Sequence, residues 1–288
     1  MSMNTKTAPA QTASPRTALG RAPGRAAALV AGSQVVMEGA GVPVRRVLPS
    51  RQATYGLVDP WLLLDEFKMD SFDGESFPPH PHRGFEIVTY MILGAGNHTD
   101  SEGNAGEVRA GGLQRITAGK GIWHGEGGGS GPAGPVHGLQ LWINLPRADK
   151  QIPPGYQAVQ AEQIPETSIG DARVRVLVGE GSPTVLHTPA IYLDATLPAG
   201  GTTDLPVPVG FQGFAYILDG AGRFGANGLD AAETQVVVLG EATGGASGDG
   251  ASGDGAFPVT AGAAGVRFVL AAARPIGETP FFNGPFVD

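Results

Sequence analysis

The fold of this chain can be read outward from residues 80–94, HPHRGFEIVTYMILG. The prolines at 78, 79 and 81 exclude a helix here, because proline lacks the backbone N–H that a helix interior needs. The β-branched and aromatic residues that follow favour a strand. Side chains of a strand alternate between its two faces, so His80 and His82 lie on the same face. The stretch therefore predicts a β-strand that presents two imidazoles together.

A second stretch, GIWHGE at residues 121–126, repeats this spacing with His124 and Glu126. A single HxH pattern is weak evidence, because strand histidines are often simply hydrogen-bonded. Two such pairs favour a metal site, since three imidazoles and a carboxylate suit a divalent first-row ion. A ligand set that leaves coordination positions open is typical of a catalytic site. We therefore expect one metal ion to be held by His80, His82, His124 and Glu126.

Glu86 competes with Glu126 for the carboxylate position. It has the same parity as His82, but four strand residues span about 13 Å, so both contact one ion only if the strand bulges. We therefore expect Glu86 to lie behind the ligands or to hold Arg83, and Glu126 to be the ligand.

The remaining histidines carry less signal. Residues 95–112 are polar and glycine-rich and predict a long hairpin connection. His98, within this segment, is expected at the surface or behind the ligands. His187 lies in the second half of the chain and has no partner in the sequence there.

Composition limits the possible classes. With 46 glycines, 24 prolines and no cysteine in 288 residues, the chain favours short strands over helices and leaves only nitrogen and oxygen as metal ligands. The net charge is −8, and the first 50 residues carry six basic side chains against one acidic, so the remainder is strongly acidic. An acidic body excludes a general nucleic-acid binder. No apolar run approaches the roughly 20 residues of a membrane span.

The chain divides into a tail and two domains. Residues 1–33 lack acidic side chains and predict a disordered tail or an organellar transit peptide. Strand patterns begin near Gln34 and define a metal-binding domain over residues 34–155. A similar succession of short strands and glycine turns over residues 160–288 predicts a second barrel and an internal duplication. The low-complexity run at 244–256 is expected to be a flexible loop.

Several of these stretches resemble the pirin family of the cupin superfamily. The resemblance spans about residues 35–287 and rests on DPWLLLDEF, FPPHPHRGFEIVTYMILG, HTDSEGNAG, RITAGKGIWHGE, HGLQLWINLP, FAYILDGAG, VVVLGE, RFVLAAARPIGE and GPFV. It implies an all-β bicupin fold of two antiparallel β-barrels, with one mononuclear metal in the N-terminal barrel only. The metal ligands of the family correspond to the four residues selected above by parity.

The resemblance also implies chemistry. Pirin-like proteins have flavonol (quercetin) 2,3-dioxygenase activity, so we expect Fe(II), or Ni, Mn, Cu or Zn, a flavonol-like aromatic substrate and dioxygen. Glu126 would be the catalytic proton acceptor. DPWLLLDEF, residues 59–67, is expected in the core, and four apolar strand residues are expected either to wall the pocket or to fill the core: Phe85, Ile122, Leu141 and Ile143.

The alternative is a metal-dependent binding protein. Nuclear pirins are transcriptional coregulators whose partner surface responds to the redox state of iron, and some bacterial relatives regulate a metabolic enzyme by contact. Either implies a protein partner without turnover, and neither requires direct nucleic-acid binding or a membrane. We expect a cytoplasmic protein, or a nuclear or organellar one if the N-terminus is cleaved.

Three departures from the family pattern stand out. Lys120 replaces an arginine common beside the second motif, and residues 244–256 form an unusual insertion. Relatives continue past GPFV into a C-terminal helical segment that packs between the barrels, whereas this sequence stops at Asp288.

Overall fold

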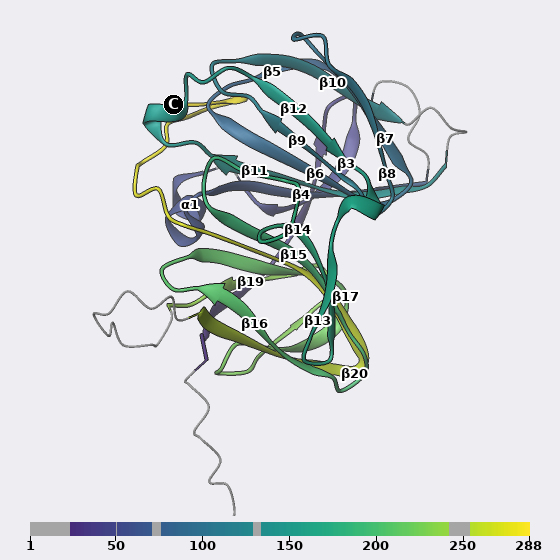
Figure 1. The fold of residues 1–288 in the computed structure, drawn as a ribbon, viewed down its shortest axis with the longest axis vertical. Helices are drawn as coiled ribbons and strands as arrows, with labels where there is room; N and C mark the ends of the chain where they lie inside the picture. Colours follow the sequence, from purple (N-terminus) through teal and green to yellow (C-terminus); the bar gives the residue numbers. More distant parts are fainter. Residues whose placement is uncertain (1–23, 50, 71–75, 129–133, 242–253) are drawn as a thin grey trace, which may run out of the picture.

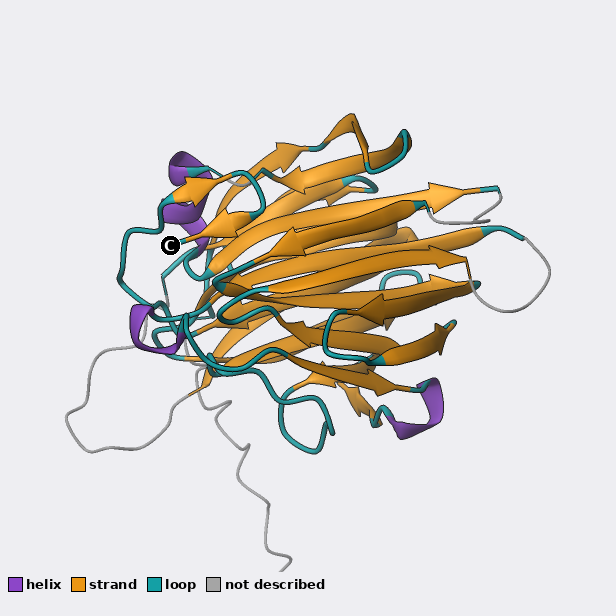
Figure 2. Cartoon of the chain, turned by 90° about the horizontal axis from the view of Figure 1, so that it is seen from above, coloured by secondary structure: helices purple, strands orange, loops and turns teal. Residues whose placement is uncertain are grey.

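The computed structural model describes residues 24–49, 51–70, 76–128, 134–241 and 254–288. These residues form two antiparallel β-barrels stacked along the longest axis, with the chain passing from the upper barrel to the lower one (Figure 1). Seen from above, the strands fill the body of the molecule and the short helices lie at its edge (Figure 2). The predicted all-β fold with two barrels is confirmed.

The first barrel is built from a seven-stranded sheet facing a four-stranded one. In the seven-stranded sheet the strands run in the order β12 (Gly155–Val159), β9 (Leu113–Thr117), β6 (Phe85–Leu93), β11 (Val136–Asn144), β4 (Trp61–Met69), β3 (Val42–Leu48) and β2 (Gln34–Glu38). In the four-stranded sheet the order is β5 (Phe77–His82), β10 (Ile122–Gly128), β7 (Ala95–Asp100) and β8 (Ala105–Arg109).

The second barrel is one strongly bent sheet of nine strands. Its main path runs β1 (Ala27–Gly32), β19 (Gln235–Leu239), β17 (Gln212–Phe224), β20 (Asp254–Ala273), β15 (Ala190–Leu197), β14 (Ala172–Val178) and β13 (Glu166–Ile169). Two further strands leave this path: β16 (Thr202–Pro208) pairs with β20, and β18 (Leu229–Ala232) pairs with β17. The length of β20 lets it pair with three strands and close the sheet.

Helices are short and peripheral in the described part of the chain. They are α1 (Gln52–Val58) and two 3₁₀ turns, η1 (Arg147–Asp149) and η2 (Ala161–Gln163). None of the helices in the described ranges has the length and apolarity needed to cross a membrane. A last small hairpin, β21 (Phe282–Asn283) and β22 (Phe286–Val287), ends the chain beside the first barrel (Figure 1).

Several predicted boundaries are wrong. Ala27–Gly32, expected in the tail, forms β1 and pairs with β19, because its apolar residues complete the edge of the second barrel. Residues 95–112, expected as a connection, form the paired strands β7 and β8. Of the predicted loop at 244–256, residues 254–256 belong to β20, and the rest lie outside the described residues, as do residues 1–23.

The main hydrophobic core lies between the two barrels rather than inside either one. It joins residues of the seven-stranded sheet, such as Leu139 and Leu141, to residues of the second barrel, such as Tyr216 and Val269. Trp61 packs edge-on against Phe214 at 5.9 Å between ring centroids and donates its indole N–H to the carbonyl of Gln212. The predicted burial of Trp61 and the following leucines is confirmed.

Polar contacts fix the same interface. Tyr216 donates to Glu66 at 2.6 Å, and Tyr90 donates to Asp194 at 2.7 Å, in each case from one barrel to the other. Buried carboxylates require such partners, since an unpaired charge there would be costly. The barrels therefore form one packed body.

Truncating a side chain in this shared core tests its role. We expect Leu141→Ala to lower the free energy of unfolding by about 2–5 kcal/mol, because it leaves a cavity where repacking is constrained from both barrels. Leu93→Ala, at a position 49% exposed, should lower it by less than about 1 kcal/mol. Chemical denaturation measures both; equal losses would contradict the assignment of the core.

Candidate metal centre

The two histidine motifs lie on neighbouring antiparallel strands. On β5 and β10, His80 is directly opposite His124 and His82 is opposite Ile122. The three imidazoles meet on one side of this pair, with ring centroids 4.4 Å apart for His80 and His124, 4.7 Å for His80 and His82, and 5.1 Å for His82 and His124. The ring nitrogens of these residues lie within 4.8 Å of one another, as a shared metal ion requires.

An irregularity in the pairing lies beside this group. Between His124 and Glu126 the register shifts, so that Glu126 lies opposite Phe77 and β5 carries one extra residue. Pro78 and Pro79 occupy the extra length, where their missing N–H groups cost the sheet little. The bulge follows the His80–His124 pair, and without it Glu126 would lie opposite Pro78.

Backbone carbonyls hold two of the imidazoles in one orientation. The Nδ1 atom of His80 is 2.8 Å from the carbonyl oxygen of Pro78, and that of His82 is 3.4 Å from the carbonyl oxygen of Pro285. When each Nδ1 carries the proton and donates it, each Nε2 presents a lone pair. Metal-binding histidines are typically oriented by this kind of hydrogen bond.

Among the three histidines, His124 gives the strongest evidence for a metal ligand. It is 1% exposed, and neither ring nitrogen has a hydrogen-bond partner among the described residues. Burial lowers its pKa to about 2, and burial together with the neighbouring His80 lowers the pKa of His82 to about 3. Both rings are therefore neutral at physiological pH, the form that binds a metal.

Glu126 lies beside His124, outside the group of three histidines. With His98 and His124 it forms a second group of potential ligands that shares His124 with the first. Its carboxylate accepts hydrogen bonds from Gln140 at 2.9 Å and Gln114 at 2.5 Å. The structure thus brings three predicted ligands into one group and places Glu126 in the adjoining one.

Burial raises the pKa of Glu126 to about 7, although the hydrogen bonds from Gln140, Thr89 and Gln114 act in the opposite direction. The effect of desolvation on the pKa is larger than that of the hydrogen bonds, because the carboxylate lies inside the barrel. A small cavity of about 20 Å³, enough for about one water molecule, adjoins it and is lined mainly by apolar residues. A cation bound nearby would favour the ionised carboxylate.

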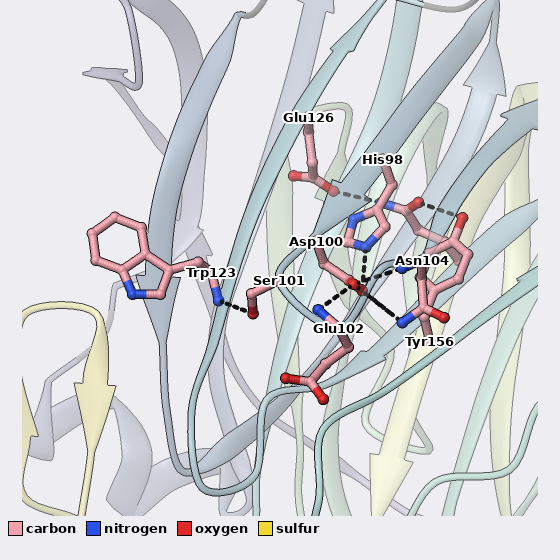
Figure 3. A network of polar contacts seen from close by, with 9 residues as sticks. His98, Asp100, Ser101, Glu102, Asn104, Trp123, Glu126 and Tyr156 are labelled. Atoms are coloured by element: carbon pink, nitrogen blue, oxygen red, sulfur yellow. Dashed lines mark hydrogen bonds and ion pairs between the residues drawn. The ribbon is translucent and has the colours of Figure 1, made fainter.

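His98 is buried, so of its two expected places, at the surface or behind the ligands, only the first is wrong. It lies on β7 directly opposite Glu126, and it stacks on the ring of Tyr156 at 4.3 Å (Figure 3). Asp100 accepts from its Nε2 at 3.0 Å and is itself held by Asn104. Nδ1 of His98 has no hydrogen-bond partner in the described ranges, which makes His98 a further candidate ligand that sequence parity had set aside.

The polar chain around Glu126 extends to Tyr156. The Tyr156 hydroxyl donates to Gln114 at 3.3 Å, and Gln114 in turn donates to Glu126. Gln114 and Gln140 were not among the residues expected at the site, because glutamines on strands are common. Their parity relative to buried neighbours was the available clue: Gln140 and Trp142 alternate with the core residues of β11.

Of the two roles expected for Glu86, lying behind the ligands or holding Arg83, the second is wrong. Glu86 does not hold Arg83, which instead pairs with Asp288 at 2.7 Å. Glu86 is fully buried and accepts from Thr117 and from the backbone N–H of His187, which joins the barrels.

The apolar residues expected around the site divide between two faces. Leu141 and Ile143 lie in the core between the barrels, because their parity on β11 turns them away from the histidines. Phe85 and Ile122 pack together beside the site. Trp142 takes the place expected for Leu141, with its ring 4.9 Å from that of His82 and stacked on Phe85.

The C-terminal segment, residues 276–288, contacts the metal-site strand at His82 and Arg83. Val287 pairs with Arg83 beside the first motif, and Lys150 donates to the carbonyl oxygens of both Val287 and Gly84. Gly84 has a φ of +90°, and a Cβ there would overlap the carbonyl oxygen of Val287. Glycine at this position therefore allows the segment to approach the metal-site strand.

Comparison with known proteins agrees with this geometry. The family model described as Pirin matches residues 41–143, and the model described as Pirin C-terminal cupin domain matches residues 192–288. The chain belongs to the pirin family. The two barrels are its two cupin domains, and the resemblance seen in the sequence is confirmed.

Similar proteins cover most of this pirin. A pirin-like protein of Arabidopsis thaliana is 43% identical over 259 residues, which are 87% of this chain and 80% of the relative. Rattus norvegicus pirin is 38% identical, covering 87% of this chain and 82% of its own. The crystal structure of quercetin 2,3-dioxygenase from Acinetobacter baumannii superposes with a TM-score of 0.80 at 27% identity, covering 91% of each chain.

The raised pKa of Glu126 predicts a pH dependence for the metal-free protein. Between the ordinary value of 4.5 and about 7, the unfolded chain releases this proton and the folded chain keeps it. The contribution of Glu126 to the free energy of unfolding therefore falls by about 1.4 kcal/mol per pH unit and levels off above pH 7.

The measurement compares wild type with Glu126→Gln in the presence of a chelator, from pH 4.5 to 8. The difference between their unfolding free energies should follow this decline, whereas the titration of His82 and His124 affects both proteins. A difference that stays constant with pH would contradict a protonated, buried Glu126.

The close approach at Gly84 also predicts an outcome. Gly84→Ala should release the C-terminal segment and increase its amide hydrogen exchange at residues 282–288 by at least about tenfold. Gly155→Ala, where a Cβ meets nothing within 4 Å, is the matched control and should leave that exchange unchanged. Unaltered protection in Gly84→Ala would show that the segment does not depend on this contact.

Proposed function

We propose that this pirin holds one divalent metal ion on His80, His82 and His124 together with Glu126, and that it is a flavonol 2,3-dioxygenase of the quercetinase type. The observation that carries the proposal is the buried His124 ring, whose two nitrogens lack hydrogen-bond partners among the described residues, at the meeting point of all the other candidate ligands. The likeness to a quercetin 2,3-dioxygenase structure supports the reaction class.

The donor set suits Fe(II) and also accepts nickel, manganese, copper or zinc, because imidazole and carboxylate bind all of these ions. When bound, such an ion supplies a Lewis acid that lowers the pKa of a substrate hydroxyl. His98 would support this centre from behind or join it, since its free Nδ1 belongs to the group that includes His124 and Glu126.

Glu126 would act as the proton acceptor. A bound metal ion would keep Glu126 ionised, which is the form that accepts a proton from a nearby hydroxyl. Gln114 and Gln140 fix its two oxygens, so its orientation does not depend on the substrate. The deprotonated flavonol would then react with dioxygen, and its ring would open with release of carbon monoxide.

The exposed side of the histidine group indicates the substrate entrance. The cavity behind Glu126 has room for about one water molecule and excludes a flavonol. His80 is partly exposed, whereas His82 and His124 are buried. A planar substrate would therefore enter past His80 and lie near Trp142, whose ring meets that of His82 edge to face.

Quercetin turnover tests the proposal. Protein loaded in turn with iron, nickel, manganese, copper or zinc should bleach quercetin and consume oxygen with at least one of these ions. Glu126→Gln should retain metal and slow turnover by about 10²–10⁴-fold, the contribution typical of a general base. His124→Ala should lose the metal itself, as measured by elemental analysis.

His187→Ala is the matched control, because this side chain is exposed and lies outside both ligand groups. It should keep both metal and activity. A filled site that turns over no flavonol with any of the five metals would overturn the enzymatic proposal and leave the iron-dependent binding protein as the alternative to pursue.

A further inference from the structure

A second polar hollow lies between the barrels, away from the metal centre. It has a volume of about 310 Å³, and its walls include Tyr90 from the first barrel and a set of polar side chains from the second: Arg173, Arg175, Asp194, Thr196 and Arg267. No step of the proposed reaction uses these residues. We call this feature the arginine hollow.

The register of the second barrel explains why the arginines meet. Thr196 on β15 lies opposite Arg173 on β14 and opposite Arg267 on β20, so one cross-strand row reads arginine, threonine, arginine. Directly opposite residues of neighbouring strands have Cβ atoms about 5 Å apart. Two residues further along β14, Arg175 lies opposite Asp194 of β15. Arg173 and Arg267 thus lie on either side of Thr196, with Arg175 two residues further along β14.

The charges in the hollow do not cancel. Asp194 is held in a two-point contact by Arg267, with distances of 2.7 and 3.1 Å. Arg173 pairs with Glu166, and both side chains are largely exposed, so this pair is weak. Arg175 donates only to neutral acceptors in the described part of the chain, the hydroxyl of Tyr90 and the carbonyl of Ala161. The lining therefore has an excess of positive charge in a protein of net charge −8.

Arg175 is also held in place before any ligand binds. Its two terminal nitrogens contact Tyr90 at 2.9 Å and Ala161 at 3.1 Å. Gly111 closes the wall beside it, since a Cβ there would lie 3.1 Å from one of these nitrogens. A guanidinium that is already ordered loses little entropy on binding an oxyanion.

We propose that the arginine hollow binds the phosphate group of a small phosphorylated molecule. Guanidinium groups recognise phosphate through paired N–H donors, and the Thr196 hydroxyl adds a neutral donor between Arg173 and Arg267. The excess positive charge matches a dianion better than a monocarboxylate. The volume admits a phosphate with a small attached group.

Isothermal titration of the metal-free protein with inorganic phosphate tests the proposal. Wild type should bind one phosphate per chain, and Arg175→Gln should weaken binding by roughly tenfold, the loss expected for a charge-assisted hydrogen bond. Arg173→Gln, a largely exposed position that folding tolerates, should weaken it several-fold. Arg175→Lys keeps the charge without the paired donors and should fall between wild type and Arg175→Gln.

Arg223→Gln is the matched control, because it removes the same charge from an exposed position on β17 outside the hollow. It should bind phosphate like wild type. His124→Ala should also bind normally, which separates this site from the metal centre and keeps the result independent of flavonol turnover.

Four results would overturn the proposal. The first is that wild type binds no phosphate at a concentration 20-fold above a Kd of about 1 mM, which is the weak end of ordinary affinities. The second is an equal loss in Arg175→Gln and Arg223→Gln, which would indicate non-specific attraction. The third is loss of binding in His124→Ala. Tighter binding of succinate than of phosphate would assign the hollow to dicarboxylates and contradict the phosphate class.

Discussion

The pairing of β5 with β10 supports every other feature of the metal centre. It places His80 opposite His124, and one extra residue of β5, at Pro78 and Pro79, then brings Phe77 opposite Glu126. On its other edge β10 pairs with β7, which brings His98 opposite Glu126. One strand, β10, thus connects both groups of candidate ligands. A shift of this register by one residue would turn His124 to the opposite face and disperse both groups.

The surroundings of the centre combine two opposed electrostatic demands. Neutral imidazoles require burial, which His82 and His124 have, while a buried carboxylate requires donors, which Gln114 and Gln140 supply to Glu126. These donors do not fully offset the desolvation of Glu126, so its pKa remains raised. Such residual imbalance is typical of functional sites rather than of structural ion pairs.

Strand parity was the strongest signal in the sequence, and it sufficed for the barrels and for the group formed by His80, His82 and His124. It failed where a residue belongs to the site through pairing between strands, as with His98, whose strand was hidden by glycines and polar residues. For Leu141 and Trp142, the sequence does not indicate which side chain faces the core between the barrels. Both are apolar neighbours on β11, and only the position of the second barrel decides which of them faces the core. Long-range contacts of this kind leave no local pattern in a single sequence.

The two ends of the described chain are exchanged between the barrels. Strand β1 completes the second barrel although it precedes the first, and Val287 pairs beside the histidines of the first barrel although it follows the second. Consequently no single cut in the gene separates the barrels into complete halves. A fragment made of residues 34–155 would lack the cover over His82, and one made of residues 160–288 would expose the edge of β19. Circular permutation, which keeps both crossings, is the better way to relocate the termini of this protein.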